Sequence, residues 1–289
     1  MIKKFIKIVN YFFQSILIYI LFIIGRLLGI KVGRKVFAYL FFLVGPFFKS
    51  TKIIKKNLKI FSSTNIHLNE KKIINYLWKS YGMTFIEYIF LDHFNKCNTH
   101  VKINDEANLN LITSEQKPVI FISGHFSNFE LMSMEISKKN IPLATIYRPL
   151  NNIFLNPFME YLRKKYICKY QIKKGVKGVK DTIEFIKSNK SIALMIDQRV
   201  SEGEKINFFN QPAFTTTLPA KLSTKFNMDI VPVYIERDLD NNFKIEFQKR
   251  IRPGDFQNKI SLTEKLNQIL EDMIKRNPNQ WIWTHDRWK

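Results

Sequence analysis

The segment PVIFISGHFSNFE, residues 118–130, gives the clearest indication of the fold class. Its first half is a short apolar run that ends at Gly124, a composition typical of a buried strand. Polar residues follow at once, and the stretch Phe129 to Lys138 behind them has the pattern of a helix. A strand that passes through a polar turn into a helix is a building unit of α/β sheets.

The same alternation of strand and helix patterns recurs along the rest of the chain. Further apolar runs predict strands at Leu143 to Tyr147, Ser191 to Asp197, Ile230 to Ile235 and Phe243 to Phe247. Helical stretches lie between several of them, at Asn156 to Tyr166, Gly178 to Ser188 and Thr217 to Phe226. We therefore expect an α/β fold with a central, largely parallel or mixed sheet flanked by helices. In such sheets the ligand site forms at the carboxyl ends of the strands, so GHFSNFE, YRP and DQR should converge.

Two apolar runs of different length occupy the amino terminus. Roughly 18 uncharged residues separate Lys7 from Arg26, which is near the lower limit for a membrane span and predicts an N-terminal membrane helix. The second run, Val36 to Phe48, fits a re-entrant or interfacial helix, or a buried core helix. We divide the chain into a membrane anchor with an interfacial helix, residues 1–48, and one domain, residues 49–289, that begins with a helical lead-in from Thr51 to about Asn98.

Composition narrows the class of partner. The chain has 46 Lys and Arg against 24 Asp and Glu, a formal charge of +22, which favours a polyanion such as nucleic acid, anionic lipid headgroups or a phosphorylated glycolipid. An RNA-binding motif with aromatic residues is not found, so we expect no nucleic-acid partner. The two cysteines, Cys97 and Cys168, lie far apart without a CxxC or Cys/His cluster and indicate neither a disulfide framework nor a zinc site, and no cofactor is expected.

His125 and Glu130 are the sharpest chemical feature of the sequence. A hydroxyl is a poor nucleophile until its proton is removed, and histidine has a suitable pKa for that task. A carboxylate can orient such an imidazole, which makes Glu130 a candidate partner. Five residues on a helix rotate by roughly 140°, so His125 must lie in the turn before the helix. Alternatively, Ser127 and Glu130 have the spacing of a capping box, in which the glutamate only caps the backbone.

Several ordered motifs carry a resemblance to a known family. They are GHFSNFE (124–130), YRPLNN (147–152), DQR (197–199), FFNQPAFTTTLPA (208–220) and QWIWTHDRWK (280–289). In this order they resemble the lipid A late acyltransferases, also called lauroyl or myristoyl acyltransferases, and the likeness extends from about Lys55 to the last residue. The wider glycerolipid acyltransferase superfamily uses a similar His-x4-Asp motif.

The resemblance implies an acyltransferase domain on the cytoplasmic face of the bacterial inner membrane. It further implies an acyl carrier protein thioester as donor, a phosphorylated glycolipid of the Kdo-lipid IVA type as acceptor, and no metal. His125 then corresponds to the general base and Glu130 to the paired carboxylate. Actinobacterial relatives place a second acidic residue at a strand end near the histidine, and Asp197 matches that position, so it competes with Glu130.

Four further residues are assigned to substrate binding. Arg148 can present a guanidinium fork to a lipid phosphate or to the developing oxyanion, although a structural ion pair is the alternative. Arg163 matches an arginine that is common in the family, or is part of a solvated basic face. Asn128 and Gln198, in the GHFSNFE and DQR segments, complete the set.

The resemblance also has departures and rivals. Asn210 stands where the family commonly has Gly, a change that left-handed backbone tolerates, and Asp286 stands where a basic residue is common. Trp281, Trp283 and Trp288 fit either an interfacial aromatic edge or the core. The alternative functions are a lysophospholipid or glycerophosphate acyltransferase, and a non-catalytic basic membrane scaffold.

Overall fold

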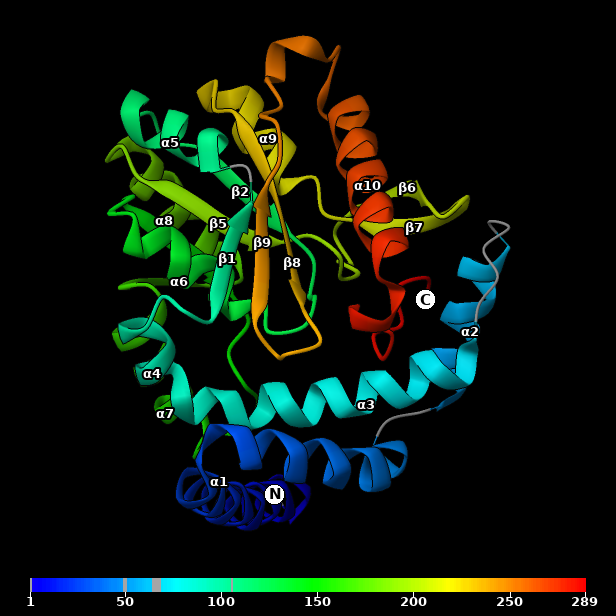
Figure 1. Cartoon of the computed structure of the whole chain (residues 1–289). Helices are drawn as coiled ribbons and strands as arrows, with labels where there is room; N and C mark the ends of the chain where they lie inside the picture. Colours follow the sequence, from blue (N-terminus) through cyan, green and yellow to red (C-terminus); the bar gives the residue numbers. More distant parts are fainter. Residues whose placement is uncertain (1, 49–50, 64–68, 105) are drawn as a thin grey trace.

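A seven-stranded sheet forms the centre of the protein in the computed structural model, which describes residues 2–48, 51–63, 69–104 and 106–289 (Figure 1). The strand order is β1-β9-β8-β2-β5-β3-β4. Strands β8, β2, β5, β3 and β4 are mutually parallel. Strand β9 pairs antiparallel with β8, and β1 pairs parallel with β9. The bounds are β1 Val101–Asn104, β2 Ile120–Ser123, β3 Leu143–Tyr147, β4 Tyr170–Lys173, β5 Ser191–Met195, β8 Ile230–Arg237 and β9 Phe243–Phe247.

The predicted fold class is confirmed, and each predicted strand is present. The long, β-branched run of β8 is buried because it lies inside the sheet, and β2 is buried along its whole length. A separate antiparallel hairpin pairs β6 (Glu204–Phe208) with β7 (Gln211–Thr215). At the turn between them Asn210 has a φ of 57°, the left-handed conformation that asparagine tolerates.

Helices flank the sheet on both sides. In Figure 1, α5 and α6 lie toward one side and α9 and α10 toward the other. The predicted helices correspond to α6, α7, α8 and α9, and the helical lead-in comprises α2, α3 and α4 with a short 3₁₀ turn, Tyr88–Phe90. The bounds are α2 Thr51–Ser62, α3 Glu70–Glu87, α4 Leu91–Lys96, α5 Glu106–Glu115, α6 Glu130–Lys138, α7 Asn156–Leu162, α8 Val176–Lys187, α9 Leu218–Phe226 and α10 Lys259–Arg276.

The amino-terminal helix α1, Ile2–Phe48, runs beneath α3 at the carboxyl edge of the parallel strands (Figure 1). It is long and apolar enough to cross a membrane. A break at Gly29, with φ 72° and ψ 163°, divides it into two arms that correspond to the two apolar runs. The contact between α1 and α3 is close, because a Cβ on Gly82 would lie 2.0 Å from the carbonyl oxygen of Phe37.

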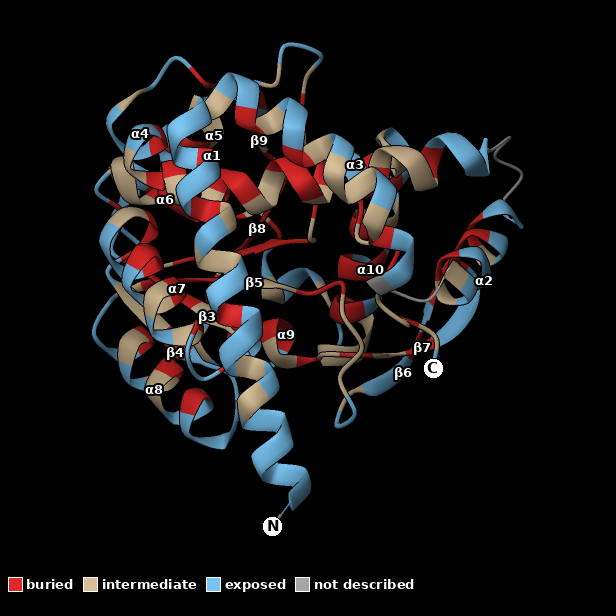
Figure 2. Cartoon of the chain, turned by 90° about the horizontal axis from the view of Figure 1, so that it is seen from below, coloured by how far each residue is buried: buried red, intermediate tan, exposed pale blue. Residues whose placement is uncertain are grey.

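The carboxyl-terminal tryptophans belong to the core rather than to an exposed edge. Trp281 and Trp283 are fully buried, and their rings meet edge to face with centroids 4.7 Å apart. Trp288 stacks on Phe208, and its indole N–H donates to the Phe208 carbonyl at 3.0 Å. Buried residues fill the space between sheet and helices, while α1 is mostly exposed (Figure 2). The last ten residues therefore close the molecule over the end of the sheet.

Candidate active site

His125 lies in the tight turn between β2 and α6, at the carboxyl end of a central strand. Gly124 makes the turn possible, since a Cβ there would lie 2.8 Å from the Phe126 ring and 2.9 Å from Leu270. The turn is fixed from the other side by a backbone bridge between Phe126 and Trp281. Ser127 adopts a positive φ of 46°, which directs the chain away from the strand before α6 begins.

Asp197, at the end of β5, holds His125 at two points. Its Oδ1 lies 2.7 Å from His125 Nδ1, and its Oδ2 accepts from the His125 backbone N–H at 2.7 Å. Oδ2 also accepts from the Trp281 indole N–H at 2.9 Å. Burial alone would raise the pKa of Asp197, but the charge of His125 and these hydrogen bonds hold that pKa below its usual value. Asp197 therefore stays ionised and fixes the imidazole with Nδ1 as the protonated nitrogen.

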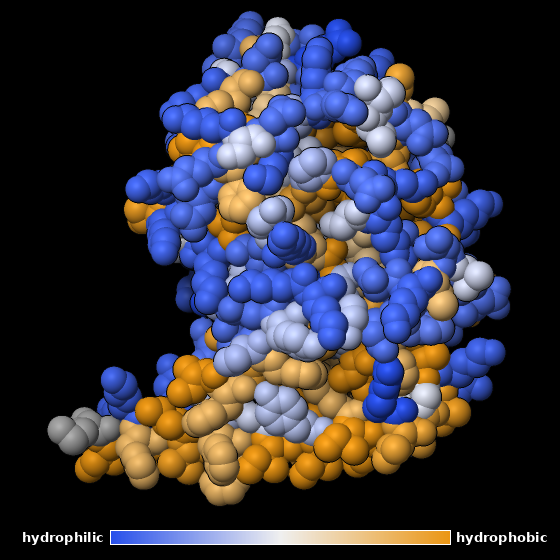
Figure 3. Space-filling view, turned by 90° about the vertical axis from the view of Figure 1, so that its left-hand side faces the viewer, coloured by the Kyte–Doolittle hydropathy of each residue, from blue (hydrophilic) through white to orange (hydrophobic). Residues whose placement is uncertain are grey.

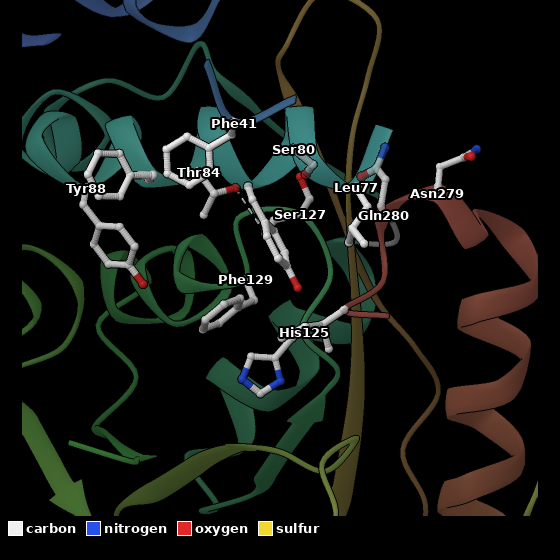
Figure 4. A pocket seen from close by; sticks show the side chains of 13 residues that line it. Phe41, Leu77, Ser80, Thr84, Tyr88, His125, Ser127, Phe129, Asn279 and Gln280 are labelled. Carbon is white, nitrogen blue, oxygen red and sulfur yellow. Dashed lines mark hydrogen bonds between the residues drawn. The ribbon is translucent and has the colours of Figure 1, made fainter. Parts of the chain in front are cut away.

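A cavity of about 270 Å³ adjoins His125 (Figure 4). Apolar side chains from three parts of the fold line it, including Phe41 of α1, Phe85 of α3 and Phe129 after the turn. The polar groups on its wall include Ser127, whose hydroxyl is buried and makes no hydrogen bond within the described part of the chain. In the same region no described group hydrogen-bonds His125 Nε2, and the His125 side chain is 19% exposed. The free ring nitrogen is thus available to a substrate at an apolar cavity.

Glu130 does not contact His125; it makes a different pair. Its Oε1 accepts from Arg163 Nε at 2.8 Å, from Arg163 Nη2 at 2.5 Å and from the Tyr88 hydroxyl at 2.8 Å. The capping-box alternative is also wrong, because Phe129 occupies the N-cap of α6 and no side chain caps it. The solvated position considered for Arg163 is wrong as well, since Arg163 is buried. This ion pair ties α6 to the π-helical turn Arg163–Ile167 that follows α7.

A third buried carboxylate, Glu87 of α3, connects the His125 turn to α1 and β8. It pairs with Arg237 of β8 and, at 2.6 Å, with Arg34 of α1. Asn128 donates to Glu87 Oε2 at 2.9 Å, so its amide holds the turn to this cluster. Gln280 adds a second brace by accepting from the Ser127 backbone N–H at 2.9 Å. The turn between β2 and α6 that carries His125 is therefore anchored to α1, α3, β8 and the carboxyl-terminal segment.

The remaining predicted residues, Arg148 and Gln198, do not line the cavity. Arg148 follows β3 and is exposed, and it makes no ion pair with any described carboxylate, which is contrary to the structural alternative. Gln198 is half-buried next to Asp197. GHFSNFE and DQR meet directly as expected, whereas the described residues of the YRP segment make no hydrogen bond or ion pair with His125 or Asp197. Among the described residues, no group of three His, Cys, Asp or Glu side chains is placed to hold a metal ion.

Two residues of the site escaped the sequence interpretation. Trp281 was assigned only to an interfacial edge or to the core, and nothing in its spacing revealed that its indole would bind Asp197. Glu87 offered a weak signal, because it is a lone carboxylate in the apolar stretch MTFIEYIF. A charge in such a stretch, when buried, needs paired cations, and Arg34 and Arg237 supply them.

Comparison with known proteins identifies a family and a similar solved structure. The model of the bacterial lipid A biosynthesis acyltransferase family matches residues 2–289. Among solved structures, the 1-acyl-sn-glycerophosphate acyltransferase of Thermotoga maritima covers 88% of this chain and 100% of its own, with 13% identity and a TM-score of 0.43. No curated protein matches the sequence.

Proposed function

Because the chain belongs to the bacterial lipid A biosynthesis acyltransferase family, we propose that it transfers a fatty acyl chain from an acyl carrier protein thioester to a hydroxyl of a lipid A precursor of the Kdo-lipid IVA type. The reaction takes place at the inner membrane, with the domain of residues 49–289 on the cytoplasmic side. The observation that carries the proposal is the His125–Asp197 pair beside an apolar cavity.

In this mechanism His125 Nε2 is the general base. It removes the proton of the acceptor hydroxyl as that oxygen attacks the thioester carbonyl carbon. Asp197 stabilises the imidazolium that forms, and the Trp281 indole keeps the carboxylate in place. When the carbon–sulfur bond breaks, the imidazolium returns the proton to the leaving thiolate. The histidine is restored, the ester and the free carrier thiol are the products, and no acyl-enzyme is required.

The other predicted residues support the substrates in different ways. Arg148 is exposed and unpaired with any described carboxylate, so it can offer a charge-assisted fork to a phosphate of the acceptor. Gln198 and Arg148 follow the neighbouring parallel strands β5 and β3, and Gln198 can contact the sugar headgroup. Asn128, Arg163 and Glu130 act indirectly, because their contacts hold the elements that surround His125.

The test is an assay of the purified protein with two donors and two acceptors. We expect turnover with acyl carrier protein thioester and a Kdo-lipid IVA acceptor, and little with acyl coenzyme A and a lysophospholipid. The reverse preference would assign the protein to glycerolipid acylation instead. No turnover with any pair, by protein that binds vesicles, would support a membrane scaffold. Mass spectrometry of lipid A after depletion of the protein, with loss of one acyl chain, checks the same assignment in cells.

A further inference from the structure

The underside of the protein is a broad apolar surface built mainly by α1 (Figure 3). Large apolar side chains of both arms are exposed there, and Leu27 and Phe47 are 83% and 88% exposed. A surface of this size on one face marks an interaction site. Other exposed apolar residues of the first arm include Phe5, Phe12, Phe13, Leu17 and Ile23.

The opposite face of the first arm is not free, because it is docked on the domain. The Ser15 hydroxyl donates to Asn152 Oδ1 at 2.9 Å, and Asn152 Nδ2 donates to the Tyr11 carbonyl at 2.8 Å. The Tyr19 hydroxyl donates to the Phe154 carbonyl at 3.0 Å. Farther along, Arg26 pairs with Asp92 at 2.9 Å. The arm therefore follows the domain from residue 11 to residue 26, and Figure 2 shows it crossing the underside.

This docking is incompatible with a helix that crosses the whole bilayer. Residues 11–26 account for roughly 24 Å of helix, and only residues 2–10 project beyond the domain, roughly 13 Å. The hydrocarbon core is about 30 Å thick. A crossing would drag the docked segment 152–158 into it, together with α7, whose Glu160 pairs with Lys173 at 2.9 Å. Charged groups at that depth are costly.

We propose that α1 lies in one leaflet of the membrane instead of spanning it, and that the segment 150–154 enters the same leaflet beside it. Leu150, Ile153 and Phe154 are 38%, 56% and 38% exposed next to the docked arm, and the Phe12 and Phe154 rings are in edge contact. The proposal rests on the exposed apolar side chains of α1 and on its contacts with the domain. It is therefore independent of whether His125 takes part in acyl transfer.

Charge agrees with this placement at both ends of the first arm. Lys3, Lys4 and Lys7 are exposed before it, and Lys31 and Lys35 are exposed after the break at Gly29. A helix in one leaflet keeps both groups of lysines at the same layer of anionic headgroups, which attracts them. It also explains why the basic flanks are balanced, since neither end has to cross.

The first experiment determines which side of the membrane each end of the first arm faces. Lys3→Cys, Lys31→Cys and Lys180→Cys, the last on the exposed surface of α8, are made in a Cys97→Ser protein. Each is inserted into inner-membrane vesicles of one known orientation and treated with a membrane-impermeant maleimide. We expect Lys3→Cys to be labelled from the same side as Lys31→Cys and Lys180→Cys. Labelling of Lys3→Cys only from the opposite side would overturn the proposal, and the Cys97→Ser protein alone gives the baseline.

The second experiment tests the segment 150–154 with a matched control. A fluorophore is attached at Ile153→Cys or at Leu111→Cys, which has a similar exposure of 49% but lies on α5 at the far end of the molecule from α1. The full-length protein is bound to vesicles of phosphatidylethanolamine and phosphatidylglycerol that contain lipids with a nitroxide on the acyl chain. We expect quenching at Ile153→Cys to exceed that at Leu111→Cys by about threefold or more, because only the former reaches the acyl chains. Equal quenching at both positions would refute the insertion of this segment.

Discussion

Asp197 and Glu130 are two buried carboxylates on either side of the same turn, and their partners differ in kind. Asp197 faces a histidine ring and two N–H donors, and that histidine lines the cavity. Glu130 faces an arginine that stays charged at every physiological pH, together with a tyrosine hydroxyl. A carboxylate paired with a titratable ring can support proton transfer, whereas one closed by a guanidinium can only hold parts of the fold together.

The largest effect is expected when the imidazole that Asp197 holds is removed. A positioned general base contributes about 10² to 10⁴ in rate, so His125→Ala should lose at least about a hundredfold in turnover while it remains folded and bound to membranes. Steady-state kinetics with the carrier-protein donor and circular dichroism check both parts. Turnover within about threefold of wild type in a folded His125→Ala protein would remove the base from the mechanism.

Asp197→Asn should separate orientation from proton transfer. An amide N–H directed at His125 Nδ1 favours the tautomer whose Nε2 carries the proton, and that tautomer cannot act as base. We expect turnover to fall by about 10² or more with little change in the acceptor KM. A fall in affinity with unchanged turnover would show instead that Asp197 shapes the binding site.

Glu130→Gln should lower stability rather than turnover, unlike the two preceding variants. Removing one charge from a buried pair leaves Arg163 uncompensated, and we expect about 2 kcal/mol less free energy of unfolding, with turnover within about threefold of wild type. Denaturant unfolding and kinetics measure the two effects. In the double variant Glu130→Gln, Arg163→Gln the losses should be less than additive. A hundredfold loss of turnover at unchanged stability would restore Glu130 as the partner of the base.

Arg148 differs from the buried Arg163 in that its expected role is to bind substrate. Arg148 has no described carboxylate partner, so Arg148→Ala should raise the acceptor KM by about tenfold and leave stability unchanged, the loss expected for one charge-assisted contact. Arg148→Lys should recover part of it. An acceptor KM equal to that of wild type would show that the phosphate binds elsewhere.

The smallest expected effect is a pH dependence of stability. Because the folded state lowers the pKa of Asp197, its contribution is present above the unfolded value of about 4 and is lost as the pH falls through the folded pKa. The difference in melting temperature between wild type and Asp197→Asn should therefore narrow below about pH 4. Calorimetry at pH 7 and at pH 3 checks this, and a constant difference would argue against an ionised Asp197.

The sequence allowed prediction of those site residues whose position depends on their neighbours in the chain. His125 follows a short apolar strand and a glycine, so its place in a turn could be predicted from the residues beside it. The edge strands β1 and β4 and the hairpin β6–β7 were missed, because they are short, carry charged or polar residues and are stabilised by their neighbours. The choice between Asp197 and Glu130 could not be made either, since it depends on β2 and β5 being adjacent.

Periodicity, charge and local turns are properties of neighbouring residues, so the α/β fold, the basic and apolar amino terminus and a histidine at a strand end could be inferred from the sequence. The folded chain was needed to learn that Asp197 holds His125, that Arg163 pairs with Glu130, that the distant Trp281 completes the site, and which face of α1 is docked. These outcomes depend on contacts between segments far apart in the sequence, where the pairing of each buried charge is set by the strand order and by the helices that pack across it.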